Sequence, residues 1–245
     1  MRTRCWNGWV CCMRLEEKRA DDGAAALANE QLQKFLYAAS HDLQEPLRAI
    51  VAYAQLMERH LAGDAVAQEY LPFIMSGANR MKELLQNILI YAHAGCSQKR
   101  KAISLEVPLA RALLKLAPAI EANNGRITRH SLPEVVADEA EIALVFENLL
   151  RNSLQFRSTA APEISIAAEQ GSDECVVTLR DNGLGIDPQF REEVLLPFKR
   201  LHGKDLSGTG LGLAICEKII RAHEGCIWLE SDGLHGAAVH FTLPS

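Results

Sequence analysis

The stretch FLYAASHDLQEPLR, residues 35–48, decides the fold of the first part of the chain. Its apolar residues belong to a longer series with alternating steps of three and four, the pattern of a helix with one buried face. This spacing turns His41 towards solvent, next to the carboxylate of Asp42. An exposed imidazole beside a carboxylate is a candidate nucleophile, although an isolated pair of this kind is usually an ordinary surface pair.

The helical pattern extends on both sides of this stretch and then repeats. The first series of apolar positions is Leu32, Leu36, Ala39, Leu43, Leu47, Ile50, Ala54, Met57 and Leu61. After a predicted turn at 62–64, the second series is Leu71, Ile74, Ala78, Met81, Leu85, Ile88 and Ala92. Such steps form the seam of coiled coils and helical bundles. Two such helices expose more apolar surface than one hairpin can bury, so we expect a homodimer that forms a four-helix bundle.

Composition and charge limit the class of protein. The 245 residues predict one or two domains, and the net charge of −5 argues against direct binding of nucleic acid. Every apolar run is shorter than the ~18 residues that a membrane span requires, so we expect no membrane span and a cytoplasmic protein. The seven cysteines lack the spacing of zinc ligands, which argues against a zinc site.

The sequence pattern changes after residue 95. The polar, basic segment 96–102 is predicted to be a linker, and strand and helix patterns alternate in residues 103–245. We expect a strand followed by a helix within 103–116, helices at 138–156 (capped by Asp138) and 211–223, and strands at 126–130, 134–137, 163–168, 175–179, 226–230 and 238–243. This mixed order favours an α/β sandwich, with one sheet backed by helices on a single face.

Two asparagines on the helix predicted at 138–156 are candidate ligands. Asn148 and Asn152 are four residues apart, and therefore lie on one face of the helix. Neutral amide oxygens suit a Mg²⁺ ion that keeps most of its waters and binds substrate phosphates. A polar surface stripe would have the same spacing, so the pair alone does not decide between the two interpretations.

Two glycine-rich segments add to a candidate nucleotide site. The segment DNGLG, 181–185, follows a predicted strand, where the Asp181 carboxylate can accept a hydrogen bond from the amine of adenine and glycines let the backbone approach the base. The segment SGTGLG, 207–212, opens the next helix, and N–H groups at a helix N-terminus can bind phosphate. The second segment is neither a P-loop nor a Rossmann fingerprint. Taken singly, the two segments are also compatible with an ordinary turn and a flexible loop.

Taken in order, these motifs resemble the transmitter core of two-component sensor histidine kinases, in particular the subgroup fused to phytochrome-like and PAS sensors. The resemblance covers residues 30–245 and rests on SHDLQEPLR (40–48), the segments 148–156, 181–185 and 208–212, and PFKR (197–200). It implies an N-terminal segment or start of a signalling helix at 1–29 and a dimerisation and histidine phosphotransfer domain at 30–95. It also implies the linker at 96–102 and a catalytic ATP-binding domain of the Bergerat, histidine-kinase-type ATPase fold at 103–245.

The resemblance implies a role for each matched residue. His41 would accept the phosphoryl group, Asp42 would act as general base or orient the imidazole, and Arg200 would lie near the γ-phosphate. Asn152 would bind Mg²⁺. The ATP-binding residues would be Asn148, Asn152, Asp181, Gly183, Gly185, Phe198, Gly208, Thr209, Gly210, Leu211 and Gly212. ATP and Mg²⁺ are thus the expected cofactors and a response regulator receiver domain is the expected partner, with input from a separate sensor protein or a sensor domain outside this sequence.

Two residues depart from the family pattern. Gln155 stands where many relatives have a phosphate-binding lysine, and Lys199, Arg200 and Lys204 are the candidate replacements. Glu45 stands where relatives with phosphatase activity have Thr or Asn. A carboxylate at that position would repel an aspartyl phosphate, so we expect weak phosphatase activity towards the partner.

Two other functions are compatible with parts of the pattern. One is a serine kinase or ATPase with the same nucleotide fold, which would lack the histidine-bearing hairpin at 30–95. The other is a dimeric phosphotransfer or scaffold module with a decayed ATP site, against which the intact asparagine and glycine segments argue.

Overall fold

The structure is a computed structural model that describes residues 43–44, 46–61, 63–97, 99–199 and 209–245. Six residues of interest, His41, Asp42, Glu45, Arg200, Lys204 and Gly208, therefore lie outside the described residues. The chain divides into two compact units, with a boundary between His93 and Ala94. Within the described ranges, no helix is long and apolar enough to cross a membrane.

In the unit that ends at His93, the described residues are mainly helical. Residues 43–44 and 46–60 are helical, and α3 spans Ala65–His93. The side chain of Asp64 caps α3, because its Oδ1 accepts the backbone N–H groups of Val66 at 2.9 Å and Ala67 at 3.1 Å. The expected turn and second helix are therefore confirmed.

In the middle of both apolar series, buried and exposed positions alternate. Leu47, Ala54, Leu71 and Ala78 are buried. The intervening members of the two series are about half exposed, namely Ile50, Met57, Ile74 and Met81. A single chain thus leaves several large apolar side chains of both helices accessible to solvent, which is unusual for a monomer.

The unit from Ala94 to Ser245 is a mixed α/β domain. Its elements are β1 (Lys101–Ser104), α4 (Glu106–Ala122), β2 (Arg126–Arg129), β3 (Glu134–Ala137), α5 (Glu139–Gln155), β4 (Glu163–Gln170), β5 (Glu174–Asp181), the 3₁₀ turns η2 (Pro188–Phe190) and η3 (Glu193–Leu195), α6 (Gly212–Ala222), β6 (Ile227–Glu230) and β7 (Ala238–Pro244). The helices and strands expected from the sequence are all present, with ends that differ by a few residues.

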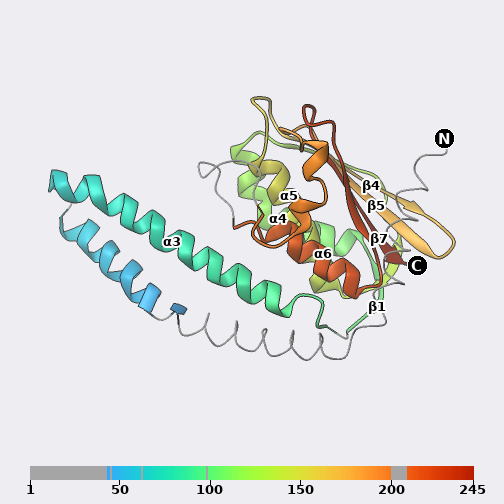
Figure 1. Cartoon of the computed structure of the whole chain (residues 1–245), viewed down its shortest axis with the longest axis horizontal. Helices are drawn as coiled ribbons and strands as arrows, with labels where there is room; N and C mark the ends of the chain where they lie inside the picture. The colour runs from blue at the N-terminus through green and yellow to red at the C-terminus, as the bar shows by residue number, and fades with distance from the viewer. Residues whose placement is uncertain (1–42, 45, 62, 98, 200–208) are drawn as a thin grey trace. The chain divides into compact units, whose positions relative to one another are not determined.

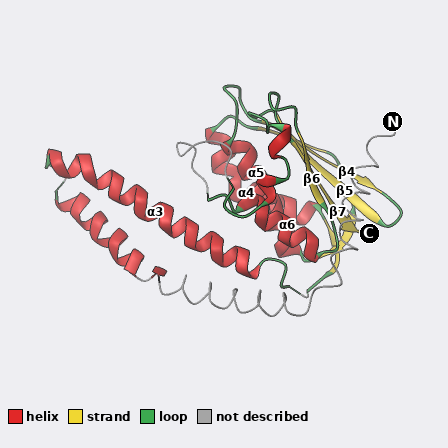
Figure 2. Cartoon of the chain, viewed as in Figure 1, coloured by secondary structure: helices red, strands yellow, loops and turns green. Residues whose placement is uncertain are grey.

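Five strands form the main sheet, in the order β2-β4-β5-β7-β6. β2 is parallel to β4, and the other neighbours are antiparallel. Helices α4, α5 and α6 lie on one face of the sheet (Figures 1 and 2). Alternate strand residues such as Ile166, Val177 and Phe241 are buried under these helices, and Phe146 of α5 meets Phe241 edge to face at 5.9 Å. This confirms the expected α/β sandwich.

A second, two-stranded sheet was not expected. β1 pairs antiparallel with β3, from Lys101 opposite Ala137 to Ser104 opposite Glu134. The expectation of a single sheet is incomplete because an apolar strand pattern predicts a strand but not its partner. β1 begins at Lys101, so the last residues of the segment 96–102 already belong to a strand.

The start of α5 is fixed by Asp138. Its Oδ1 accepts the N–H groups of Ala140 at 2.9 Å and Glu141 at 3.0 Å, and its Oδ2 accepts the hydroxyl of Ser97 at 2.5 Å. Burial raises the pKa of Asp138, but these hydrogen bonds outweigh it and hold the pKa below its usual value. The predicted N-cap is confirmed.

Replacing Asp138 with Ala should lower the free energy of unfolding by about 1–2 kcal/mol at pH 7. A carboxyl group with a lowered pKa in the folded state stabilises it above the unfolded pKa of ~3.9, and this contribution is lost as the pH falls through the folded value. Urea denaturation at pH 7 and pH 3 measures the difference in free energy of unfolding between the unaltered protein and the variant. This difference should be smaller at pH 3. An equal difference at both values would show that the charge of Asp138 is not what stabilises α5.

Candidate nucleotide site

The two asparagines of α5 converge on the start of α6. Asn148 and Asn152 are half-buried, on the helix whose leucines at 149, 150 and 154 face the core. The amide nitrogen of Asn148 donates to the carbonyl of Leu144 at 3.0 Å, which leaves its Oδ1 pointing away from that contact. A Cβ placed on Gly212 would lie 3.4 Å from Oδ1 of Asn148 and 3.7 Å from Oδ1 of Asn152. Both amide oxygens therefore face the same small volume in front of Gly212.

The N-terminus of α6 supplies the complementary donors. α6 begins at Gly212 after Leu211, which is fully buried and, being apolar, cannot cap the helix with its side chain. The first N–H groups of a helix have no partner within it, and they carry the positive end of the helix dipole. Amide oxygens on one side and N–H groups on the other fit a phosphate chain with its Mg²⁺ ion.

The carboxylate of Asp181 is held at the end of β5 by three donors. Its Oδ1 accepts the N–H groups of Gly183 at 2.9 Å and Ala237 at 3.1 Å. Its Oδ2 accepts the hydroxyl of Ser153, one residue beyond Asn152 on α5, at 2.9 Å. Asp181 is half-buried and its orientation is fixed, so it can accept a hydrogen bond from an amine of a ligand.

The glycines after Asp181 are required by close backbone contacts. A Cβ on Gly183 would lie 2.5 Å from the carbonyl oxygen of Phe156, which accepts the N–H of Leu184 at 2.9 Å. Gly185 has φ +78°, and a Cβ there would lie 2.9 Å from the backbone of Gly233. A side chain at Gly183 would push this loop away from the end of α5. A side chain at Gly185 would push it away from the β6–β7 connection.

The β6–β7 connection contacts Asp181 and the loop that follows it, and the sequence did not predict these contacts. The hydroxyl of Ser231 accepts the N–H of Ile186 at 2.9 Å and donates to the carbonyl of Gly236 at 2.7 Å. A Cβ on Gly236 would lie 2.0 Å from the carbonyl oxygen of Asp181. The turn composition of DGLHG, 232–236, was the only local signal.

The described ends of the segment between η3 and α6 contact each other through their backbones. The N–H of Phe198 donates to the carbonyl of Gly210 at 2.9 Å, and both residues have positive φ, 63° and 71°. The ring of Phe198 is 60% exposed. Thr209 is half-buried, and Nζ of Lys199 lies 3.1 Å from Oε2 of Glu193.

Most of the ATP-binding residues predicted from the sequence thus come together in one unit. These are Asn148, Asn152, Asp181, Gly183, Gly185, Phe198, Thr209, Gly210, Leu211 and Gly212. Gly208 and Arg200 lie outside the described residues, as do His41 and Asp42. Their predicted roles remain predictions.

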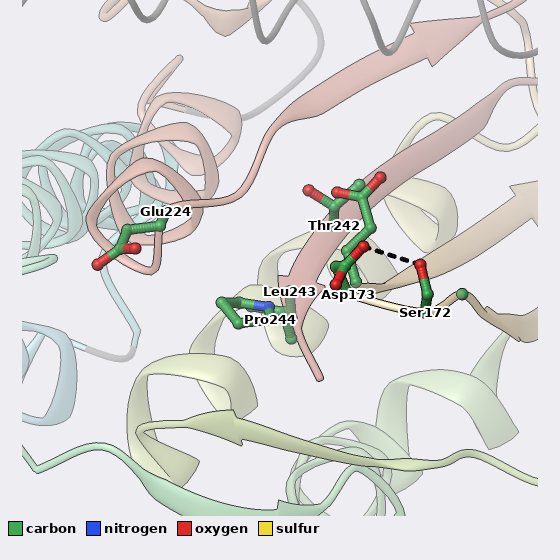
Figure 3. Close-up of a pocket in the computed structure, with 8 residues that line it drawn as sticks. Ser172, Asp173, Glu224, Thr242, Leu243 and Pro244 are labelled. Carbon is green, nitrogen blue, oxygen red and sulfur yellow. Dashed lines mark hydrogen bonds between the residues drawn. The ribbon is translucent and has the colours of Figure 1, made fainter.

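A separate cavity of about 620 Å³ lies at the opposite end of β5 (Figure 3). Its lining residues are Gly171, Ser172, Asp173, Glu174, Glu224, Thr242, Leu243 and Pro244. Glu174 is seven residues from Asp181, about 24 Å along a strand at ~3.4 Å per residue. Three of the lining residues carry carboxylates, and none of the described lining residues is basic, so this cavity disfavours a triphosphate.

Two family models match the chain. The His Kinase A (phospho-acceptor) domain matches residues 31–96, and the histidine kinase-, DNA gyrase B- and HSP90-like ATPase matches residues 137–245. Cyanobacterial phytochrome A of Nostoc sp. is 42% identical over 221 residues, which cover 89% of this chain and 29% of that protein. Phytochrome-like protein Cph1 of Synechocystis sp. is 39% identical, with 89% and 30% covered. The chain therefore spans less than a third of the length of these relatives.

Solved structures of histidine kinases share the fold. Full-length ShkA, crystallised in complex with AMPPNP, has a TM-score of 0.67 at 21% identity, over 86% of this chain and 45% of that chain. The catalytic domain of ThkA has a TM-score of 0.53 at 26% identity, over 60% of this chain and 98% of that chain. At 21% identity, the similarity to ShkA shows a shared fold and nothing more. With a phospho-acceptor hairpin followed by an ATPase domain of this type, the chain belongs to the sensor histidine kinases.

Proposed function

We propose that the chain transfers the γ-phosphoryl group of ATP to His41, and from there to an aspartate in the receiver domain of a response regulator. The observation that carries this proposal is the convergence of the Asn148 and Asn152 oxygens on the N-terminus of α6. The match to the phospho-acceptor domain over residues 31–96 supports His41 as the acceptor. The histidine kinase ThkA, crystallised in complex with the response regulator TrrA, has a TM-score of 0.61 to this chain. That complex supports a response regulator as the partner.

Each described side chain has a defined task in this proposal. Asp181 accepts a hydrogen bond from the adenine amine, and Gly183 and Gly185 let the backbone approach the base. The N–H groups at the start of α6 bind phosphate oxygens. Asn152 would hold Mg²⁺, with Asn148 beside it near the phosphates, and the ion would offset the negative charge of the phosphates.

The transfer itself is an in-line displacement. A ring nitrogen of His41 forms a bond to the γ-phosphorus while the bond from phosphorus to the bridging oxygen breaks, and ADP leaves with that electron pair. Asp42 orients the ring or accepts its proton, and Arg200 stabilises charge on the transferred group. In the second step a carboxylate oxygen of the regulator attacks the phosphorus, and the imidazole leaves.

We also propose that the hairpin forms a homodimer. The half-exposed side chains of Ile50, Met57, Ile74 and Met81 belong to the same apolar series as the buried ones. Burying them against a second copy removes the exposed series and completes a four-helix bundle.

Phosphatase activity towards the partner should be weak, because Glu45 would repel the aspartyl phosphate that a water must attack. Measuring the loss of phosphate from the phosphorylated regulator, with and without the kinase, checks this. Replacing Glu45 with Thr should increase the rate of loss. The expectation is wrong if the unaltered kinase already accelerates the loss of phosphate.

Incubation with γ-labelled ATP and Mg²⁺ separates the proposed function from its rivals. A histidine kinase gives label that is labile in acid and stable in alkali, because the phosphoramidate bond is acid-sensitive. A serine kinase with the same nucleotide fold would give the opposite stabilities. A scaffold with a decayed ATP site would give no label. Either of these results would contradict the proposal.

A further inference from the structure

Ser153 joins the two halves of the nucleotide site. It follows Asn152 on α5 and is 4% exposed. Its hydroxyl lies 2.9 Å from Oδ2 of Asp181, 28 residues away in sequence, and 3.2 Å from the carbonyl oxygen of Leu149 in its own helix. The hydroxyl of Ser153 therefore lies between α5, next to Asn152, and the carboxylate of Asp181 on β5. The proposed function does not yet give this hydroxyl a role.

The hydroxyl hydrogen has two possible acceptors, and the carboxylate is the stronger one. Hydrogen bonds to an ionised acceptor are roughly twice as strong as those between neutral groups. The contact with Asp181 is also the shorter of the two. Ser153 therefore donates to Asp181, and the carbonyl of Leu149 is the secondary contact.

Counting acceptor directions shows which oxygen of Asp181 remains available. An ionised carboxylate has about four acceptor directions, two on each oxygen. Oδ1 uses both, on the N–H groups of Gly183 and Ala237. Oδ2 uses one on Ser153, so the remaining direction belongs to the same oxygen that Ser153 contacts.

We propose that Ser153 is a positioning residue that directs the open acceptor direction of Asp181 towards the 6-amino group of adenine, and thereby sets the preference of the site for adenine over purines without that amine. The proposal rests on the proposed function, in which the base of ATP lies against Asp181. Ser153 acts only through the carboxylate. A carboxylate that is oriented before binding loses less freedom when the ligand arrives.

Two triphosphates that differ only in the amine test this. Binding of ATP and of purine riboside triphosphate, both as analogues with the same non-hydrolysable β–γ bridge, to the full chain is measured by calorimetry, for the unaltered protein and for Ser153→Ala. The variant should bind the adenine nucleotide about fivefold more weakly, the effect of one net hydrogen bond. Binding of purine riboside triphosphate should change less than about twofold, since that ligand has no amine for the carboxylate.

Rate measurements and a matched variant complete the test. In Ser153→Ala the KM for ATP in autophosphorylation should rise while kcat stays unchanged, because Ser153 does not touch the transferred phosphoryl group. Thr178→Ala removes a hydroxyl from the same strand as Asp181, where it contacts Nδ1 of His240 at 2.9 Å, and should leave both affinities unchanged. Retention of the adenine preference in Ser153→Ala, or equal weakening of both nucleotides, would overturn the inference. Failure of the unaltered chain to bind ATP at all would instead contradict the proposed function.

Discussion

Replacing Asn152 with Ala should lower the rate of autophosphorylation by about 100-fold or more, while the folded state keeps its stability. The expected decrease in rate has this size because the variant loses one preorganised polar group that stabilises the reacting phosphates. Loss of one such group typically lowers the rate by about 10²–10³-fold. Alanine is a better helix former than asparagine, so α5 should not be weakened. Initial rates of label incorporation and urea denaturation measure the two effects.

The control for this variant is Asn123→Ala. Asn123 is an amide in the same unit, the residue that follows α4, and its side chain donates to the carbonyl of Ala119 at 2.7 Å. Its loss should leave the rate unchanged. If Asn152→Ala retains more than about a tenth of the rate, the amide oxygen is not the important Mg²⁺ ligand that we propose.

Replacing Gly236 with Ala should abolish ATP binding and lower the free energy of unfolding by about 2–4 kcal/mol. Gly236 has φ +79°, and its Cβ would lie 2.0 Å from the carbonyl oxygen of Asp181 and 2.9 Å from Cα of Asn182. Neither neighbour is the end of a flexible side chain, so the backbone itself must move. That movement displaces Asp181, which holds the base in the proposed function.

Gly225→Ala separates this local effect from a general loss of stability. A Cβ on Gly225 would also lie 2.0 Å from a backbone carbonyl oxygen, that of Thr242, which also lines the cavity at the far end of β5. The two variants should lose similar stability, but the folded fraction of Gly225→Ala should bind ATP with unchanged affinity. Equal loss of ATP affinity in both variants would show that Gly236 has no specific role in the nucleotide site. Calorimetric titration below the melting temperature of each variant makes the comparison.

Elements with a local signal were predictable from the sequence. Asp138 precedes an apolar helical pattern, and it caps α5 as expected. Asn148 and Asn152 were placed on one helix face by their spacing, and the structure brings their oxygens to Gly212. These features depend on the helical repeat and on residues close in sequence.

Contacts between distant residues were not predictable in the same way. Ser153 and Asp181 are 28 residues apart, and Asp181 and Ala237 are 56 residues apart. A serine within an apolar helix pattern gives no sign of its partner. The pairing of β1 with β3 has the same origin, because short strands of four residues specify their partner only through the packing of the whole domain.

The most direct test of the central claim is the label incorporated from γ-labelled ATP by the chain with His41 replaced by Gln. Glutamine keeps a polar side chain of similar size but lacks the nucleophilic imidazole. The account predicts that this variant binds ATP with the affinity of the unaltered chain and incorporates no label. Acid-labile label that persists in His41→Gln would show that another residue accepts the phosphoryl group, and would contradict the account.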